Sequence, residues 1–454
     1  MTVLAFVVGV AVLVVGLAVS IALHELGHLV PAKLFGVRVG QYMIGFGPTL
    51  FSRRKGETEY GVKAIPLGGY ISMAGMYPPA EVAESADEVG EADAVPVGAP
   101  AEVAAAGREH ARRTPGRFFA TMMQDARASN EATLQGPDDD RVFYRLPVHK
   151  RIIVMLGGPV MNLVLAIVIF TILLTGIGVQ TATATIASLS DCVPVSSTSS
   201  DCASSTTPAE TAGLEAGDRI VSIDGTVVST FADASAIIQA SAGQRLTLVV
   251  ERDDAELTLE ITPVAIDGAT TDDDGDTVTT QIGFIGIRPT TEYVREPIWS
   301  GTTTAFENVG AVAGVMVQLP AKVYDTAVSL FTGAERDPNG PLSVVGAGVI
   351  AGEAAASDAP ILDRVEYILG LLGSLNIALF VFNLIPLLPL DGGHVVIALW
   401  DGAKRTWAKA FRRPPPKPVD SARLVPLTFV VVVVLIAMSA ILIVADLVNP
   451  ISLF

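Results

Sequence analysis

Four long apolar runs decide what this chain can fold into. They lie at about residues 3–23, 152–178, 366–390 and 425–447. Each has about the 20 residues that an α-helix needs to cross a bilayer. The mean hydropathy of +0.51 and the charged fraction of 17% are typical of a membrane protein. We therefore predict a polytopic α-helical membrane protein with four transmembrane helices. No basic patch of the size that a nucleic-acid partner would require is present in the sequence.

The distribution of charge predicts the orientation of these helices in the inner (plasma) membrane. Residues 395–424 hold two acidic residues against seven basic ones, which are Lys404, Arg405, Lys409, Arg412, Arg413, Lys417 and Arg423. Residues 180–365 are strongly acidic instead. Because cytoplasmic loops carry the excess of Lys and Arg, we expect residues 395–424 in the cytoplasm and residues 180–365 outside it. No Lys or Arg precedes Lys33, so we expect the first run to be retained rather than cleaved as a signal peptide.

The segments between the helices differ in composition. With their flanks, the predicted helices occupy 1–30, 151–179, 365–394 and 425–448. Six further segments follow from the changes in composition: a membrane-associated β-region at 31–77, a largely disordered cytoplasmic insertion at 78–150, a linker at 180–206, a folded domain at 207–290, an extracytoplasmic connecting segment at 291–364 and a basic cytoplasmic loop at 395–424. Alternation in "TEYGVKAI" and "GYISM" supports the β-region, although an ordinary cytoplasmic β-subdomain has the same pattern.

The linker contains Cys192 and Cys202, which are the only two cysteines of the chain. Both lie in the region expected outside the cytoplasm, where disulfides persist. We favour a short-range disulfide, with a pair of free thiols as the alternative.

The folded domain begins with "AGLEAGDRIVSIDG", residues 212–225, and continues with alternating strands and one amphipathic helix. This stretch resembles the PDZ fold in its bacterial, permuted arrangement, and the resemblance extends back to about residue 185. The resemblance implies an extracytoplasmic α+β domain that accepts a peptide or a substrate ectodomain as an added strand.

The end of the first run carries the stretch "HELGH", residues 24–28. Positions i and i+4 share one face of a helix, so His24 and His28 can present two imidazoles to one metal ion. Glu25 lies beside that face, where it can act as general base for a water molecule. Ionisable groups within a membrane span usually mark function, because burying them unpaired is costly.

Catalytic zinc takes three protein ligands, so two histidines are not enough. Asp391 follows Pro386 and Pro389 at the end of the third run, on the same expected side of the membrane as HELGH. His394 is a competing third ligand. A turn or N-cap role for Asp391 beside two glycines is the alternative without metal.

Together, HExxH and N-x-x-P-x-x-x-x-D-G (Asn383, Pro386, Asp391 and Gly392) resemble the site-2 protease family of intramembrane zinc metalloproteases, peptidase family M50. Further matches are "GFGPTLF", "GGPVMN" and "GPLSVVGAGVIAG". The resemblance implies Zn²⁺ held by His24, His28 and Asp391, with Glu25 as catalytic base. It also implies that Asn162 and Asn383 contact the substrate, although simple helix packing explains them nearly as well.

Four spans with one PDZ domain are similar to the bacterial branch that cleaves membrane-bound anti-sigma factors. This resemblance implies a zinc endopeptidase in the lipid bilayer that cuts a single-span substrate after a first extracytoplasmic cut, in regulated intramembrane proteolysis. Two other hypotheses stay open. One is a membrane zinc peptidase whose third ligand is a glutamate, for which Glu366 is the candidate nearest to a later span. The other is a PDZ-bearing membrane scaffold without activity.

Overall fold

The computed structural model describes residues 2–76, 140–197, 201–271 and 277–451, apart from positions 335, 338, 339, 415, 418 and 420. It divides into two compact units, Met1–Leu173 with Ile298–Phe454, and Leu174–Pro297. Of the insertion predicted at 78–150, residues 78–139 lie outside the described residues, so the predicted disorder stays a prediction there.

Among the described residues, four helices are long and apolar enough to cross a membrane. They are α1 (Thr2–Leu34), α5 (Val148–Ile172, continued by a π-helical turn at Leu173–Ile177), α10 (Ile361–Asn383) and α12 (Val425–Val448). The prediction of four such helices is confirmed. Many of their large apolar side chains, such as Val433 and Val434, are about half exposed, as expected where lipid is the solvent.

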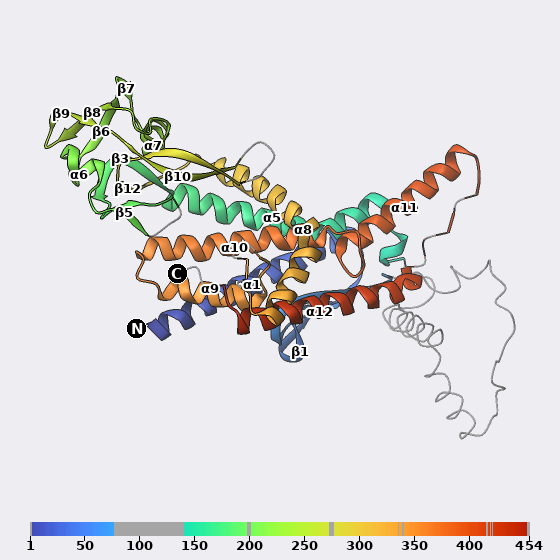
Figure 1. The fold of residues 1–454 in the computed structure, drawn as a ribbon. Coiled ribbons are helices and arrows are strands. Elements are labelled where there is room, and N and C mark those ends of the chain that lie inside the picture. The colour runs from blue at the N-terminus through green and yellow to red at the C-terminus, as the bar shows by residue number, and fades with distance from the viewer. Residues whose placement is uncertain are drawn as a thin grey trace, which may run out of the picture. The chain divides into compact units, whose positions relative to one another are not determined.

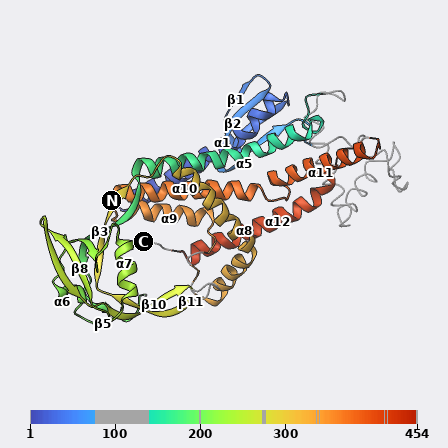
Figure 2. The ribbon, with the colours of Figure 1, turned by 90° about the horizontal axis from the view of Figure 1, so that it is seen from above.

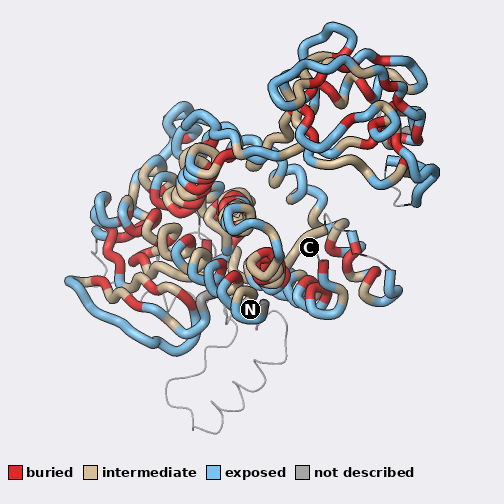
Figure 3. Tube along the Cα trace, turned by 90° about the vertical axis from the view of Figure 1, so that its left-hand side faces the viewer, coloured by how far each residue is buried: buried red, intermediate tan, exposed pale blue. Residues whose placement is uncertain are grey.

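Helices α1, α5 and α10 pack against one another (Figure 1), and α1 and α5 lie side by side in the view from above (Figure 2). Where they cross, a Cβ atom on Gly27 would stand 2.2 Å from the carbonyl oxygen of Gly157. Only glycine permits this approach, in the manner of small-residue contacts between membrane helices. The crossing brings the HELGH turn of α1 against the start of α5. Buried residues gather inside this helical unit (Figure 3).

A β-hairpin follows α1, formed by β1 (Val39–Lys55) and β2 (Thr58–Met73). Both strands bend, so that residues 39–44 pair with 69–73 on one side and with 59–62 on the other. The part of β2 at 69–73 is therefore an edge of this sheet. Tyr42 ties the sheet to α1 by donating its hydroxyl to the Ala22 carbonyl oxygen at 2.7 Å. The hairpin lies within the segment 31–77 for which the sequence predicts β-structure, and the first residues of that segment, up to Leu34, still belong to α1.

The third span ends earlier than the predicted 365–394. Helix α10 stops at Asn383, before the prolines, and a new helix, α11 (Asp391–Ala410), begins at Asp391. The sequence predicts a loop at 395–424, but the structure shows that the first half of this segment is helical. Prolines lack the backbone N–H that a helix interior needs, so Pro386 and Pro389 end α10 before the new helix begins. At the start of α5, Arg151 forms a buried ion pair with Asp401 of α11 at 3.0 Å.

The predicted connecting segment at 291–364 is mostly helical. It contains α8 (Ser300–Thr332) and α9 (Val344–Ala356), and α9 packs on α1. Between these helices, Arg336 forms an ion pair with Asp446 of α12, and Asp446 also accepts the backbone N–H of Ser343 at 2.7 Å. Both charged side chains are buried, so this pair fixes the α8–α9 connection to the last span.

The second unit is built on a sheet of order β12-β3-β6-β8-β9, with β7 paired to β6. These strands are β3 (Val179–Leu189), β6 (Arg219–Ile223), β7 (Thr226–Val227), β8 (Leu246–Arg252), β9 (Ala255–Ile261) and β12 (Ile287–Val294). Two helices, α6 (Pro208–Ala212) and α7 (Phe231–Ala240), and the hairpin of β10 (Val264–Thr271) with β11 (Thr277–Phe284) complete it. Its own core includes Ile220, Ile223, Leu248 and Val250.

In the second unit, β4 (Val193–Pro194) and β5 (Cys202–Ser204) form a small hairpin that is separate from the main sheet. A disulfide joins Cys192 to Cys202, with Cα atoms 5.7 Å apart. The preferred interpretation of the two cysteines is confirmed. Ser197 holds the hairpin to β10 by donating its backbone N–H to the Asp267 carbonyl oxygen at 2.8 Å.

Candidate metal centre

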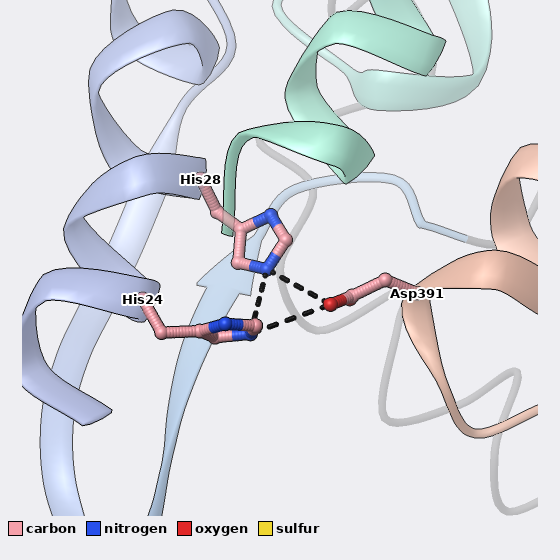
Figure 4. A group of neighbouring side chains, drawn as sticks. All are labelled: His24, His28 and Asp391. Carbon is pink, nitrogen blue, oxygen red and sulfur yellow. Dashed lines mark hydrogen bonds and ion pairs between the residues drawn. The ribbon is translucent and has the colours of Figure 1, made fainter. Parts of the chain in front are cut away.

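Three side chains from distant parts of the sequence converge at the end of α11 nearest to α1 (Figure 4). His24 and His28 come from successive turns of α1, and Asp391 is the first residue of α11. The Nε2 atoms of the two histidines are 3.3 Å apart, and each lies 3.3 Å from Oδ2 of Asp391. The structure therefore brings together the three ligands that the sequence predicts.

The distances within this group fit a tetrahedral ion. Zinc binds nitrogen and carboxylate oxygen at about 2.0–2.1 Å, and two corners of such a tetrahedron are about 3.3–3.4 Å apart. The group has three such separations of 3.3 Å. Among the described residues, Asp391 Oδ2 is buried and accepts no hydrogen bond, although two ring nitrogens face it. Two imidazole nitrogens and one carboxylate oxygen at these separations are a donor set that zinc uses, so the residues present fit zinc.

The tautomer of His28 also suits a ligand. Its Nδ1 lies 2.8 Å from the Val154 carbonyl oxygen. A carbonyl can only accept, so Nδ1 carries the proton and the neutral ring presents the Nε2 lone pair to the cluster. His28 is almost fully buried, which fixes this orientation.

Glu25 lies between the two histidines in sequence and is 7% exposed. The edge strand of the hairpin passes directly against it, because a Cβ on Gly69 would stand 2.9 Å from Cγ of Glu25. The sequence does not predict this contact, since hairpin register depends on pairing. The carboxylate of Glu25 is thus placed between the histidine turn and a strand edge.

The structure places only one of the other predicted site residues next to the three-ligand group. Asn162 lies beside the cluster, with its amide nitrogen 3.1 Å from Nδ1 of His24. Asn383 instead donates its amide to the Leu379 carbonyl oxygen of its own helix at 3.0 Å. Within the described part of the chain, His394 is not a member of the three-ligand group, so the structure favours Asp391 over His394. The alternative N-cap role for Asp391 is not seen either, because Leu390 is the N-cap residue of α11.

Two supporting residues were missed. Asn376 of α10 donates to the hydroxyl of Ser20 on α1 at 3.0 Å, and both residues are fully buried. Ser20 precedes His24 by one turn of α1, so this bond holds α10 against the histidine face. An Asn in the same apolar run as Asn383 is the only sequence signal for it.

Comparison with known proteins gives matches over most or all of the chain. The model of peptidase family M50 matches residues 12–413. Zinc metalloprotease Rip1 of Mycobacterium bovis is 32% identical over 469 aligned positions, which cover 99% of both chains. Rip1 of Mycolicibacterium smegmatis is 31% identical with the same coverage. Metalloprotease MmpA of Caulobacter vibrioides is 26% identical over 87% of each chain.

Proposed function

Because the chain belongs to peptidase family M50 and is a zinc metalloprotease of the site-2 type, we propose that it cuts a single-span membrane protein within or near its membrane segment. The family, the enzyme class and the zinc cofactor that the sequence predicts are confirmed. The scaffold hypothesis and the hypothesis of a third glutamate ligand are therefore set aside. The observation that carries the proposal is the convergence of His24, His28 and Asp391 on one point, with Glu25 and both histidines on a helix long and apolar enough to cross a membrane.

His24, His28 and Asp391 would hold the ion, and Glu25 would move protons. Bound zinc supplies Lewis acidity, which lowers the pKa of a water molecule and polarises a peptide carbonyl. Glu25 takes one proton from the attacking water as its oxygen bonds to the carbonyl carbon. When the C–N bond breaks, Glu25 returns that proton to the departing amine nitrogen. The low exposure of Glu25 keeps other water away from this proton transfer.

The substrate would approach as an extended strand. A helix has its amide groups internally bonded, so its backbone must unwind before it is attacked. Residues 69–73 form a sheet edge beside Glu25, and a substrate strand paired there would satisfy its backbone groups while its carbonyl faces the site. Small or helix-breaking residues in the substrate would ease the unwinding.

We further propose the orientation that the charge predicts, with the metal centre toward the cytoplasm and the second unit outside the inner membrane. The basic residues of α11 and the disulfide of the second unit both support it. In this proposal the second unit is a PDZ-type domain that restricts access until a first cut has shortened the substrate, and an anti-sigma factor is the kind of substrate that fits.

The test compares the full-length protein with Glu25→Gln and Asp391→Ala, each reconstituted in vesicles with a single-span substrate lacking its outer domain. We expect cleavage only by the wild type, zinc retention in Glu25→Gln and zinc loss in Asp391→Ala. Cleavage at the wild-type rate by Glu25→Gln would overturn the protease proposal.

A second experiment tests the role of the second unit. Deleting residues 207–290 should permit cleavage of the untrimmed substrate if this unit acts as a filter. Unchanged selectivity after the deletion would contradict the filter and leave the protease assignment intact.

A further inference from the structure

One face of α5 supports both histidines of the metal centre. Val154, Gly158 and Asn162 lie four residues apart and therefore on successive turns of the same face. All three are buried. The Val154 carbonyl faces Nδ1 of His28, the bare Cα of Gly158 faces both imidazoles, and the Asn162 amide faces Nδ1 of His24.

The Val154 carbonyl presents an oxygen to His28, whereas the Asn162 amide presents its nitrogen to His24. The amide nitrogen of Asn162 lies 3.1 Å from Nδ1 of His24. Its oxygen, Oδ1, is buried and has no hydrogen-bond partner among the described residues. A buried amide oxygen without a partner costs about 1–3 kcal/mol, so this arrangement leaves an acceptor in need of a donor.

Zinc bound to His24 would supply such a donor, the N–H group at Nδ1 of the same ring. A histidine that binds zinc through Nε2 must carry its proton on Nδ1. This N–H can donate to an oxygen but not to the amide nitrogen. The nitrogen and oxygen ends of a carboxamide have nearly the same shape, so a half-turn of the group exchanges them without a steric cost.

We propose that Asn162 is a positioning residue for zinc, with its Oδ1 accepting the Nδ1 proton of His24. The inference rests on the proposed metal function and assigns Asn162 a role different from the substrate contact that the family resemblance implies. Asn162 is 1% exposed, and a half-turn satisfies Oδ1 and holds the His24 ring at once. His28 has the equivalent support from the Val154 carbonyl.

The test measures zinc affinity of the solubilised full-length protein by competition with a chelator. Asn162→Leu keeps the size of the side chain and removes the acceptor, so we expect affinity to fall about 10- to 100-fold, as for other outer-shell partners. Asn162→Asp keeps an oxygen in place and should retain most of the wild-type zinc affinity, because the acceptor for the Nδ1 proton remains. Asn383→Leu makes the matched change in another span and should leave zinc affinity unaltered.

Wild-type zinc affinity in Asn162→Leu would overturn the proposal. An equal loss in Asn162→Leu and Asn162→Asp, both folded by circular dichroism, would overturn it too, because packing rather than the acceptor would then matter. If leucine prevents folding, Asn162→Ala takes its place with the same expectation. These outcomes do not depend on proteolysis, so a wild type that binds zinc and cuts nothing would refute the proposed function alone.

Discussion

A Cβ atom on Gly158 of α5 would stand 2.2 Å from Nε2 of His28, so the bare Cα of this glycine is what makes room for the imidazole. The same Cβ would stand 2.8 Å from Cε1 of His24. The metal centre therefore depends on a glycine in α5, a helix that contributes none of the three candidate ligands.

We predict that Gly158→Ala removes zinc from the solubilised protein and abolishes cleavage, because the added methyl group displaces both rings. Zinc content and peptide-bond cleavage are the measurements. Gly370→Ala is the matched control, since a Cβ on Gly370 of α10 has no neighbour within 4 Å among the described residues. Full zinc occupancy in Gly158→Ala would show that the rings can be accommodated elsewhere.

Asp391 and His394 can be separated by their effects on zinc affinity. Asp391→Ala should weaken zinc binding by more than the roughly 100-fold upper range for an outer-shell partner, because it removes a direct ligand. His394→Ala should leave the affinity within about threefold of the wild type, since His394 is outside the ligand group. The reverse pattern in the chelator competition would make His394 the third ligand.

The disulfide should stabilise the β4–β5 hairpin. Closing a loop of this length is worth about 2–3 kcal/mol in the chain-entropy model. We expect the double variant Cys192→Ser, Cys202→Ser to speed amide hydrogen exchange in residues 190–197, as reduction of the wild type should. Exchange in β8, which is remote in the sheet order, serves as the internal reference. Equal protection with and without the bond would contradict this prediction.

Asp218 should make the second unit acid-sensitive. Burial raises the pKa of its carboxyl group, but hydrogen bonds from Arg252 and from the backbone of Glu215 outweigh burial and hold the pKa below its usual value. A carboxyl group with a lowered folded pKa contributes stability above its unfolded pKa of about 4, and this contribution is lost as the pH falls through the folded value.

Asp218→Asn should therefore cost about 1.5–3 kcal/mol at pH 7, because it removes the buried carboxylate that accepts from Arg252, and progressively less below pH 4. Arg252 keeps its second ion pair, with Glu215. Hydrogen exchange of β6 and β8, with wild type and variant compared at each pH, measures the difference. Glu260→Gln is the control, because its pair with Arg245 is largely exposed and worth less than about 1 kcal/mol. A pH-independent difference would exclude ionisation of Asp218 as the cause.

The parts that the sequence predicts correctly rest on local patterns. Run length identifies the four spans, because a bilayer of fixed thickness selects about 20 apolar residues. The spacing of His24 and His28 places two imidazoles on one face. The predicted end of the third span, residue 394, was less accurate, because the apolar run continues through a break between Asn383 and Asp391 that only the two prolines mark in the sequence.

The neighbouring sequence did not predict the roles that the structure indicates for Gly158, Asn376 and Asn162. Gly158 lies in the "GGPVMN" stretch of the sequence, and only the structure shows that it makes room for two imidazole rings. Asn376 differs little in sequence context from Asn383, yet one bonds to α1 and the other to its own helix. Which polar residue meets which depends on how far each helix is rotated about its axis, and no local periodicity fixes that rotation across two helices.

By itself, the sequence determined that this chain has four apolar runs of membrane-spanning length, a HExxH turn at the end of the first and an Asp-Gly motif after the third, because those signals are local. Only the tertiary structure decided that the three ligand atoms stand 3.3 Å apart, that Glu25 meets a strand edge and that one face of α5 supports both histidines. The physical reason is that ligand geometry depends on how α1 and α11 each pack on α5. Gly27, Gly157 and Gly158 permit the close contact of α1 with α5, because a Cβ atom on any of them would clash with the other helix.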